Sequence, residues 1–225
     1  MFAVIFEVRP KQERWDDYLT YAKLLRPDLE GIDGFIDNIR YGSKRRPGWV
    51  LSLSTWREEK ALVRWRTQAR HHGVQEKGRS EVFEDYHLRV GEITSDTRIP
   101  PGQALRAQRL DETEAGPAKA VSIVDIKRPP DLAEDAPAED IARRLGWRAD
   151  LPGLLAWDVY DAILTPGDLL LLLSWHTHAA ADEADRLFPR EARLRRVRII
   201  RDYGMFDRRE APQYYPEIAG RQARR

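Results

Sequence analysis

The 225-residue sequence contains no cysteine. This absence excludes disulfide bonds, thiolate zinc sites and thiol nucleophiles. The sequence also lacks any apolar run near the roughly 20 residues that a helix needs to cross a bilayer. Neither sign of charge dominates, because 38 basic side chains face 37 acidic ones. The overall charge therefore favours binding neither to nucleic acid nor to a membrane surface.

The N-terminal segment lacks the basic residues that open a secretory signal peptide. Its first apolar run, MFAVIF, meets an acid at Glu7. We therefore expect a cytoplasmic protein. With 42% hydrophobic and 33% charged residues, the composition is that of a globular chain, and the length suits one large domain or two small ones.

Two apolar segments that follow Pro-Gly turns resemble each other. RRPGWVLSLSTW ends at Trp56 and LTPGDLLLLLSW ends at Trp175, 119 positions later. Around them, strand-like segments occur at 2–8, 34–41, 49–56 and 81–90, and again at 119–127, 150–162, 168–175 and 194–206. Aligning Gly31 with Gly153 gives an offset of 122, which implies an indel of three residues between the copies.

Helical periodicity follows the first and third strand of each copy. Trp15, Tyr18 and Leu25 share one helix face, and we expect Pro27 and Gly31 to end that helix. One continuous second helix is expected to carry Ala61, Leu62, Trp65, Ala69 and His72 on a single stripe. In the second copy, shorter helices are expected at 138–147 and 179–188. The order βαββαβ in each copy is that of a ferredoxin-like unit.

The boundaries of the units follow from composition. We expect an N-terminal domain over 1–93, a polar linker over 94–118, a C-terminal domain over 119–206 and a tail over 207–225. The tail is rich in aromatic residues and proline, and is expected to cap the other unit's pocket or a barrel seam.

The apolar run 169–173 predicts how the two units meet. It is apolar at every position, so both faces of this strand need burial. Packing the two sheets face to face satisfies that need and closes a barrel. The predicted fold class is therefore α+β, with two tandem ferredoxin-like units forming a dimeric α+β barrel within one chain. Formation of a further homodimer remains open.

Residues 45–90 carry a family resemblance. They contain a strand that ends in Trp and a charged residue, a helix with Trp, a turn with His, a Gln, and a final strand with Tyr. This pattern resembles the antibiotic biosynthesis monooxygenase family of the dimeric α+β barrel superfamily, over residues 1–93 and more weakly over 119–206. The chain would be a tandem, two-domain member.

The resemblance implies a pocket between the helices and the sheet of one unit. Haem degraders of the family combine a strand Asn, a helix Trp and a His ten residues after that Trp. Here Trp65 matches, but Glu7 and Gln75 stand at the other two positions, which argues against haem degradation. The cofactor-free oxygenases of the family imply a phenol site, for which Asn38, Arg40, Trp65 and Tyr86 are available.

The histidines supply the candidate base. His72 lies seven residues after Trp65, so on one helix the two would share a face toward the pocket. His72 could then accept a proton, or ligate haem iron if haem is bound. The alternative is a frayed, solvent-exposed helix end. His71 would point nearly 100° away, toward solvent, and is the second candidate haem ligand.

Three further side chains have both a functional and a structural interpretation. Glu7, in the middle of a strand, could be a second base with a raised pKa, or could pair with Arg40 or Arg89. Tyr86 is expected to face the pocket, in preference to His87. Trp56 could line the substrate pocket or simply close the end of a strand in the core.

Two polar segments have simpler interpretations. His176 and His178 could form half of a metal site, but a turn with Thr177 as helix N-cap is favoured, and we expect no metal. The basic run at 193–201 is interpreted as a solvated strand face and not as a nucleic-acid site.

These observations favour a small oxygenase with its pocket in the N-terminal domain. A base, His72 or Glu7, would deprotonate an electron-rich aromatic substrate, whose anion would react with O₂ while Trp65 and Tyr86 stack on it. The cofactor is either none or haem. One alternative is a haem enzyme of the same fold with a helix His as axial ligand, and another is a non-enzymatic module that binds a small ligand or serves a stress response.

Overall fold

The structure, a computed structural model, describes residues 1–212. Its N-terminal half has the expected order of elements. The strands are β1 (Phe2–Pro10), β2 (Phe35–Ser43), β3 (Val50–Trp56) and β4 (Phe83–Asp96), and the helices are α1 (Trp15–Glu30), α2 (Glu59–Thr67) and α3 (Ala69–Lys77). Short helical turns at Gln12–Arg14 and Gly78–Val82 precede α1 and β4.

The C-terminal half repeats this order with shorter helices. It contains β5 (Ala120–Lys127), α4 (Ala138–Arg144), β6 (Leu154–Ala162), β7 (Asp168–Trp175), α5 (His178–Ala184), a 3₁₀ turn at Asp185–Leu187 and β8 (Arg193–Gly204). None of the helices described is long and apolar enough to cross a membrane.

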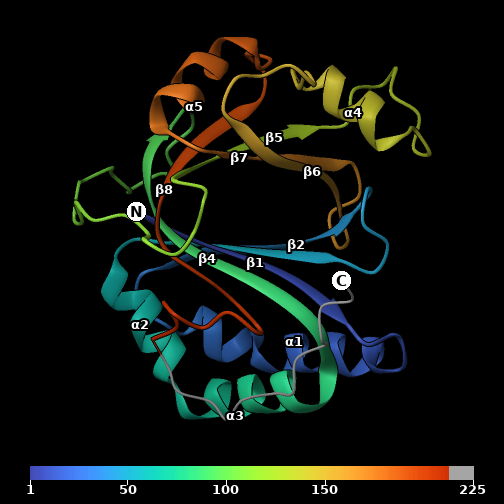
Figure 1. The fold of residues 1–225 in the computed structure, drawn as a ribbon. Coiled ribbons are helices and arrows are strands. Elements are labelled where there is room, and N and C mark those ends of the chain that lie inside the picture. Colours follow the sequence, from blue (N-terminus) through green and yellow to red (C-terminus); the bar gives the residue numbers. More distant parts are fainter. Residues whose placement is uncertain (213–225) are drawn as a thin grey trace, which may run out of the picture.

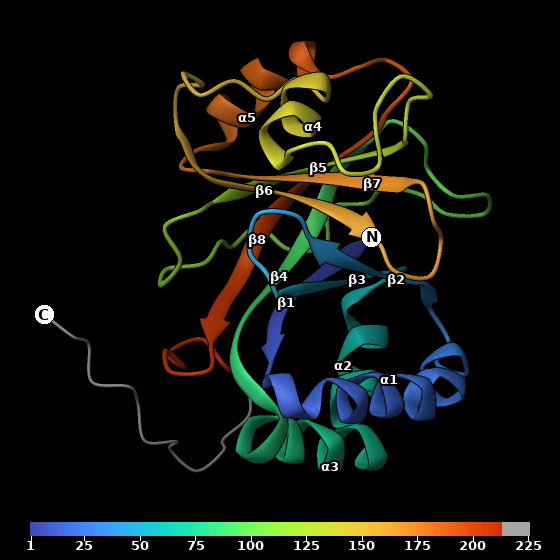
Figure 2. The same cartoon turned by 90° about the vertical axis from the view of Figure 1, so that its right-hand side faces the viewer.

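All eight strands close into one barrel, in the order β1-β3-β2-β6-β7-β5-β8-β4. The two four-stranded halves join at two seams, where β2 pairs with β6 and β4 pairs with β8. Helices α1–α3 cover one outer side of the barrel and α4 and α5 cover the opposite side (Figures 1 and 2). The predicted intrachain dimeric α+β barrel is thus confirmed.

Successive side chains of a strand point to opposite faces of the sheet, so each four-stranded half has one face inside the barrel and one face toward the helices. In β7, Leu170 and Leu172 pack inside the barrel, whereas Leu169, Leu171 and Leu173 pack against the helices. Both faces of this strand are therefore buried, as its uniform apolar sequence predicts.

The second helix differs from the prediction of one continuous stripe. Gln68 has φ −62° and ψ 126°, which is extended backbone, so α2 ends at Thr67 and α3 starts anew at Ala69. The Gln68 side-chain oxygen accepts a hydrogen bond from the His71 N–H at 2.7 Å and caps α3. The break resets the rotation of the helix, so residues on either side of it do not share one stripe.

Other local expectations are corrected at helix and strand ends. Pro27 lies inside α1, and the helix continues to Glu30 with Gly31 at its C-cap. Strand β4 extends to Asp96, six residues beyond the end of the strand predicted at 81–90. The basic run of β8 is not a solvated face: Arg195 is 3% exposed and pairs with Asp125 at 2.7 Å.

The two copies align without the three-residue indel that the sequence predicts. The counterpart of Gly153 is Gly34, not Gly31, because each opens the second strand with a positive φ, 93° for Gly34 and 74° for Gly153. A Cβ atom at either position would lie 2.7 Å from an alanine Cβ, that of Ala61 or Ala180. Gly34 to Gly153 spans 119 positions, the same as Trp56 to Trp175, so no indel separates these markers.

We expect Gly34→Ala to lower the free energy of unfolding by about 2–4 kcal/mol, because it combines a left-handed backbone with a steric clash. Gly48→Ala is the matched control: its φ is 79°, but its nearest neighbouring atom is 4.0 Å from the added Cβ. Urea unfolding measures both variants. An equal loss of unfolding free energy in the two variants would show that the added contact with Ala61 does not destabilise the protein.

Candidate functional site

A cavity of about 220 Å³ lies between helices α1–α3 and the sheet of the N-terminal half. Its walls are mostly apolar and include Val4, Phe6, Leu25, Leu62 and Leu88. Sequence alternation positions the strand residues, since the even-numbered side chains of β1 and β4 face the helices and the odd-numbered ones face the barrel interior.

A stacked Trp–His pair forms part of the wall. The Trp65 and His71 rings lie 4.0 Å apart at an interplanar angle of 14°. His71 Nδ1 lies 2.9 Å from the Trp65 carbonyl oxygen, so Nδ1 carries the proton and donates it there. His71 Nε2 is then an acceptor, 3.4 Å from the Gln75 amide nitrogen. Burial lowers the pKa of His71 to about 4, so the imidazole is neutral near pH 7.

The histidine that reaches the cavity is therefore His71 and not His72. His72 is exposed and does not line the cavity. The break at Gln68 is the physical reason, because a seven-residue spacing from Trp65 places two residues on one face only along an unbroken helix. Trp65, by contrast, lies where the sequence predicts.

Tyr86 faces the cavity, as expected, and its hydroxyl accepts two hydrogen bonds from arginines. Arg79 Nη1 lies 2.8 Å and Arg208 Nη1 lies 2.6 Å from Tyr86 Oη. Arg208 and Pro212 belong to the predicted tail and reach the cavity of the N-terminal half. The remainder of that tail, residues 213–225, lies outside the described part of the chain.

Of the three predicted substrate-binding residues, two line the cavity. Asn38 and Arg40 on β2 face it, and the Asn38 amide donates to Ser52 Oγ at 3.0 Å. Trp56 does not line it. Its ring is fully buried beside Phe35, and its Nε1 donates to Ser54 Oγ at 2.9 Å. Trp56 therefore closes the strand end in the core, which was the structural interpretation.

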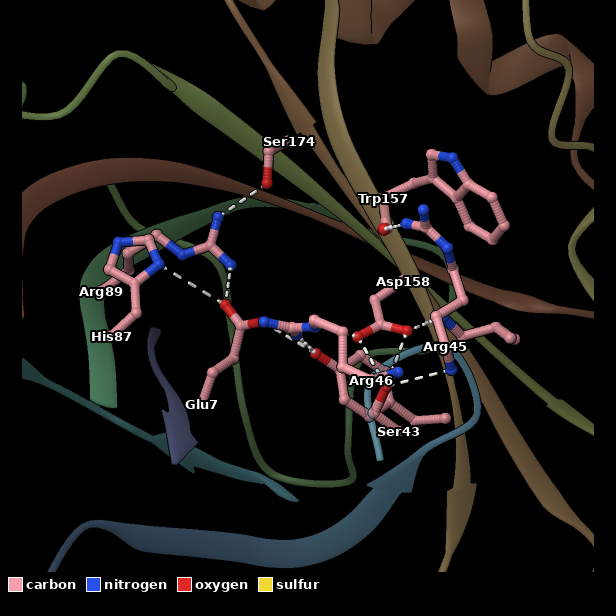
Figure 3. Close-up of polar contacts among 11 residues, drawn as sticks. Glu7, Ser43, Arg45, Arg46, His87, Arg89, Trp157, Asp158 and Ser174 are labelled. Carbon is pink, nitrogen blue, oxygen red and sulfur yellow. Dashed lines mark hydrogen bonds and ion pairs between the residues drawn. The ribbon is translucent and has the colours of Figure 1, made fainter. Parts of the chain in front are cut away.

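Glu7 lies on the opposite face of the sheet, among charges inside the barrel (Figure 3). Its carboxylate pairs with Arg46 at 2.5 Å and Arg89 at 2.6 Å, and accepts a hydrogen bond from Tyr160 Oη at 2.8 Å. Burial alone would raise its pKa, but the two guanidinium groups and Tyr160 hold the pKa at about 2. Glu7 is thus ionised and fully engaged, and it faces away from the cavity.

This cluster joins the two halves. Arg46 also binds Asp158 on β6 at 2.7 Å, and Arg89 donates to Ser174 on β7 at 2.7 Å (Figure 3). The position of Glu7 in a strand predicted an arginine partner, and Arg89 was one of two named. Arg46 and Tyr160 carried no signal in the sequence, because they approach from a hairpin turn and from the other half of the chain.

Positive charge dominates the polar part of the cavity. Among the described residues, its wall contains five arginines and one carboxylate: Arg40, Arg66, Arg79, Arg201, Arg208 and Glu59. Glu59 is paired with Arg109 at 2.7 Å. Sequence reasoning identified only Arg40, since the others are spread over α2, the turn before β4, β8 and the tail.

The corresponding space in the C-terminal half is filled. Leu169, Leu171 and Leu173 pack there against Ile141 and other residues of α4 and α5. A second cavity, of about 390 Å³, lies beside α5, but its charged residues Arg148, Asp150, Glu183 and Arg186 are all exposed.

The residues of the N-terminal cavity do not fit haem. His72, the first candidate ligand, is exposed and does not line the cavity. The volume of about 220 Å³ lies below the roughly 300–1,000 Å³ of pockets for drug-sized ligands, and haem is larger than most of these.

The His176–His178 segment follows the structural interpretation. The Thr177 hydroxyl accepts from the Ala180 N–H at 3.2 Å and caps α5. His176 is exposed, and His178 lies 3.2 Å from Glu112. Within residues 1–212, no group of three or more His, Asp or Glu side chains could hold a metal ion.

Comparisons with known proteins agree with this architecture. The sequence profile of the family described as antibiotic biosynthesis monooxygenase matches residues 1–77. Jasmonate monooxygenase ABM of Pyricularia oryzae (strain 70-15) is 50% identical over 221 residues, which cover 96% of this chain and 99% of that protein. A solved aldoxime dehydratase in complex with butyraldoxime has a TM-score of 0.52 at 10% identity, over 88% of this chain and 79% of that chain, and so shares the fold.

The fungal relative aligns with both halves of the barrel, not only with the segment that the family profile matches. Half of the aligned positions are identical over nearly the full length of both proteins. The chain is therefore an enzyme, a monooxygenase that belongs to the antibiotic biosynthesis monooxygenase family.

Proposed function

We propose that this monooxygenase oxidises a small, largely apolar organic molecule with O₂ in the cavity of the N-terminal half. The observation that carries the proposal is the combination of a mostly apolar cavity wall with the neutral His71 stacked on Trp65. Jasmonate is the first candidate substrate, because the relative of 50% identity is named for it. The electron-rich aromatic class predicted from the sequence is the second.

His71 takes the role of the base in this proposal, in place of His72 and Glu7. Its Nδ1–H is held by the Trp65 carbonyl, which leaves the Nε2 lone pair for a substrate proton. Loss of that proton gives an electron-rich carbanion that adds O₂ and takes the proton back from His71 to form a hydroperoxide. Loss of water then breaks the O–O bond and a second C–H bond and leaves a carbonyl, so R₂CH₂ + O₂ gives R₂C=O + H₂O and the substrate supplies all four electrons. Trp65 and Tyr86 present ring surfaces on which the substrate can stack.

The test is turnover under ¹⁸O₂ with jasmonate and, separately, a panel of phenols and quinols. We expect one ¹⁸O atom in the product from at least one of these compounds, detected by mass spectrometry. Ala22→Trp places a large side chain in the cavity wall and is expected to reduce turnover at least 100-fold. Ala179→Trp, on the exposed side of α5, is the matched control and is expected to retain activity.

Two results would contradict the proposal. Wild-type turnover in Ala22→Trp would show that the chemistry occurs elsewhere. A Soret band that forms stoichiometrically with haemin and is required for turnover would replace the cofactor-free reaction with the haem enzyme that the sequence left open.

A further inference from the structure

Tyr18 and Arg40 in the cavity wall each contain a buried polar atom that has no hydrogen-bond partner among the described residues. Tyr18 on α1 is 6% exposed, and among the described residues its hydroxyl has no hydrogen-bond partner. Buried hydroxyl groups are normally satisfied, because an unmade hydrogen bond costs free energy. Tyr18 lines the cavity, so a bound molecule could supply the missing acceptor.

Arg40 lies beside this hydroxyl, and its positive charge lowers the pKa of Tyr18. Its guanidinium is half-buried in the cavity wall, and its Nε is buried without an acceptor. Within residues 1–212, no carboxylate lies within ion-pair distance of Arg40, whereas the Glu59 carboxylate in the same wall is paired with Arg109. Partial removal of a cation from water without a counterion costs free energy, so this half-buried position is suited to an anionic ligand.

The two groups are complementary to a carboxylate in charge and in donor type. Burial raises the pKa of Tyr18, which keeps the phenol protonated as a donor, and the Arg40 charge offsets only part of that rise. Arginine donates through a planar fork that matches a carboxylate, and such charge-assisted hydrogen bonds are the strong ones. The apolar wall, including Leu25 and Leu62, would surround the rest of the molecule.

We propose that Arg40 and Tyr18 together bind the carboxylate of the substrate, so that the enzyme selects small monocarboxylates with an apolar body over their neutral esters. This inference rests on the proposed function, since it assigns a substrate class to the same cavity. It makes Arg40 and Tyr18 the residues that set specificity, while the stacked pair of His71 and Trp65 serves the reaction.

The experiment measures binding without turnover, by calorimetry under anaerobic conditions. The ligands are jasmonate and its methyl ester, which differ in the carboxylate alone. For the wild type we expect the acid to bind at least tenfold more tightly than the ester. Arg40→Gln is expected to weaken binding of the acid about 10- to 100-fold and Tyr18→Phe about 5- to 10-fold, with binding of the ester unchanged in both.

Arg26→Gln is the control for charge. Arg26 lies on α1, as Tyr18 does, but it is exposed and pairs with Glu30, so its loss removes one positive charge outside the cavity. Thermal unfolding establishes that each variant is folded, and Arg40→Lys is expected to restore part of the preference for the acid by restoring the charge.

The outcomes separate the two proposals. Selective binding of the acid that depends on Arg40, without oxygenation of any compound, would leave this inference standing and overturn the proposed function. Equal binding of acid and ester by the wild type, no binding of either, or an equal loss of both in Arg40→Gln would overturn the inference. Turnover of jasmonate can persist where acid and ester bind equally or lose affinity equally, and turnover of a phenol or quinol can persist where neither binds, so none of these outcomes overturns the proposed function.

Discussion

Replacing His71 with phenylalanine is expected to lower kcat by about 10²- to 10⁴-fold, the usual contribution of a general base. Phenylalanine keeps the stack on Trp65 and the volume of the ring, but it removes the nitrogen that accepts the proton. The same substitution at His72 is the control, because His72 is exposed and lies outside the cavity wall. Steady-state oxygen consumption measures both variants.

The pH dependence sharpens this test. A base must be neutral to accept a proton, and burial lowers the pKa of His71 to about 4. In the free enzyme, kcat/KM is therefore expected to stay level down to about pH 5 and to fall as the pH drops through 4. An inflection near the ordinary histidine value of about 6.5 that disappears in the His72 variant would assign the base to His72 instead.

Replacing Glu7 with glutamine is expected to lower the free energy of unfolding by about 3–5 kcal/mol, the cost of breaking a buried ion pair. The substitution preserves shape but leaves Arg89, which is 3% exposed, without its carboxylate. Urea unfolding at pH 7 measures the loss. Glu30→Gln removes an exposed partner of Arg26 and is expected to change the free energy by less than about 0.5 kcal/mol.

The same carboxylate makes the wild type sensitive to acid. The pKa of Glu7 is about 2 in the folded protein and 4.5 ordinarily, so its contribution to stability is fully present above pH 4.5 and is lost as the pH falls toward 2. The contribution is about 3 kcal/mol. Glu7→Gln is expected to lack this component of the acid transition. A folded variant of unchanged stability with no activity would instead place Glu7 in the reaction.

Much of the fold could be predicted because its signals are local or repeated. The uniform leucines of β7, the shared Trp ends of β3 and β7 and the order of elements all indicate a paired barrel. The alignment of Gly31 with Gly153 failed because it relied on residue type. Only the backbone shows that Gly34 shares the positive φ and the nearby alanine of Gly153.

The candidate site could be predicted in part. Alternation along β2 and β4 places Asn38, Arg40 and Tyr86 toward the helices, and Trp65 follows from helical spacing. The division of the chain at residues 93, 118 and 206, the cytoplasmic location and a further homodimer remain predictions.

The sequence by itself determined that two βαββαβ units close one barrel, because burial of strand and helix faces follows from short-range periodicity. Only the tertiary structure decided which side chains meet. One extended residue, Gln68, brings His71 to the cavity in place of His72. Of the partners of Glu7, Arg89 was predicted, whereas Arg46 approaches from the turn between β2 and β3, and only closure of the barrel brings Tyr160 of β6 to Glu7. Such contacts depend on how strands that are distant in the sequence are placed in space, and a local sequence pattern does not predict that placement.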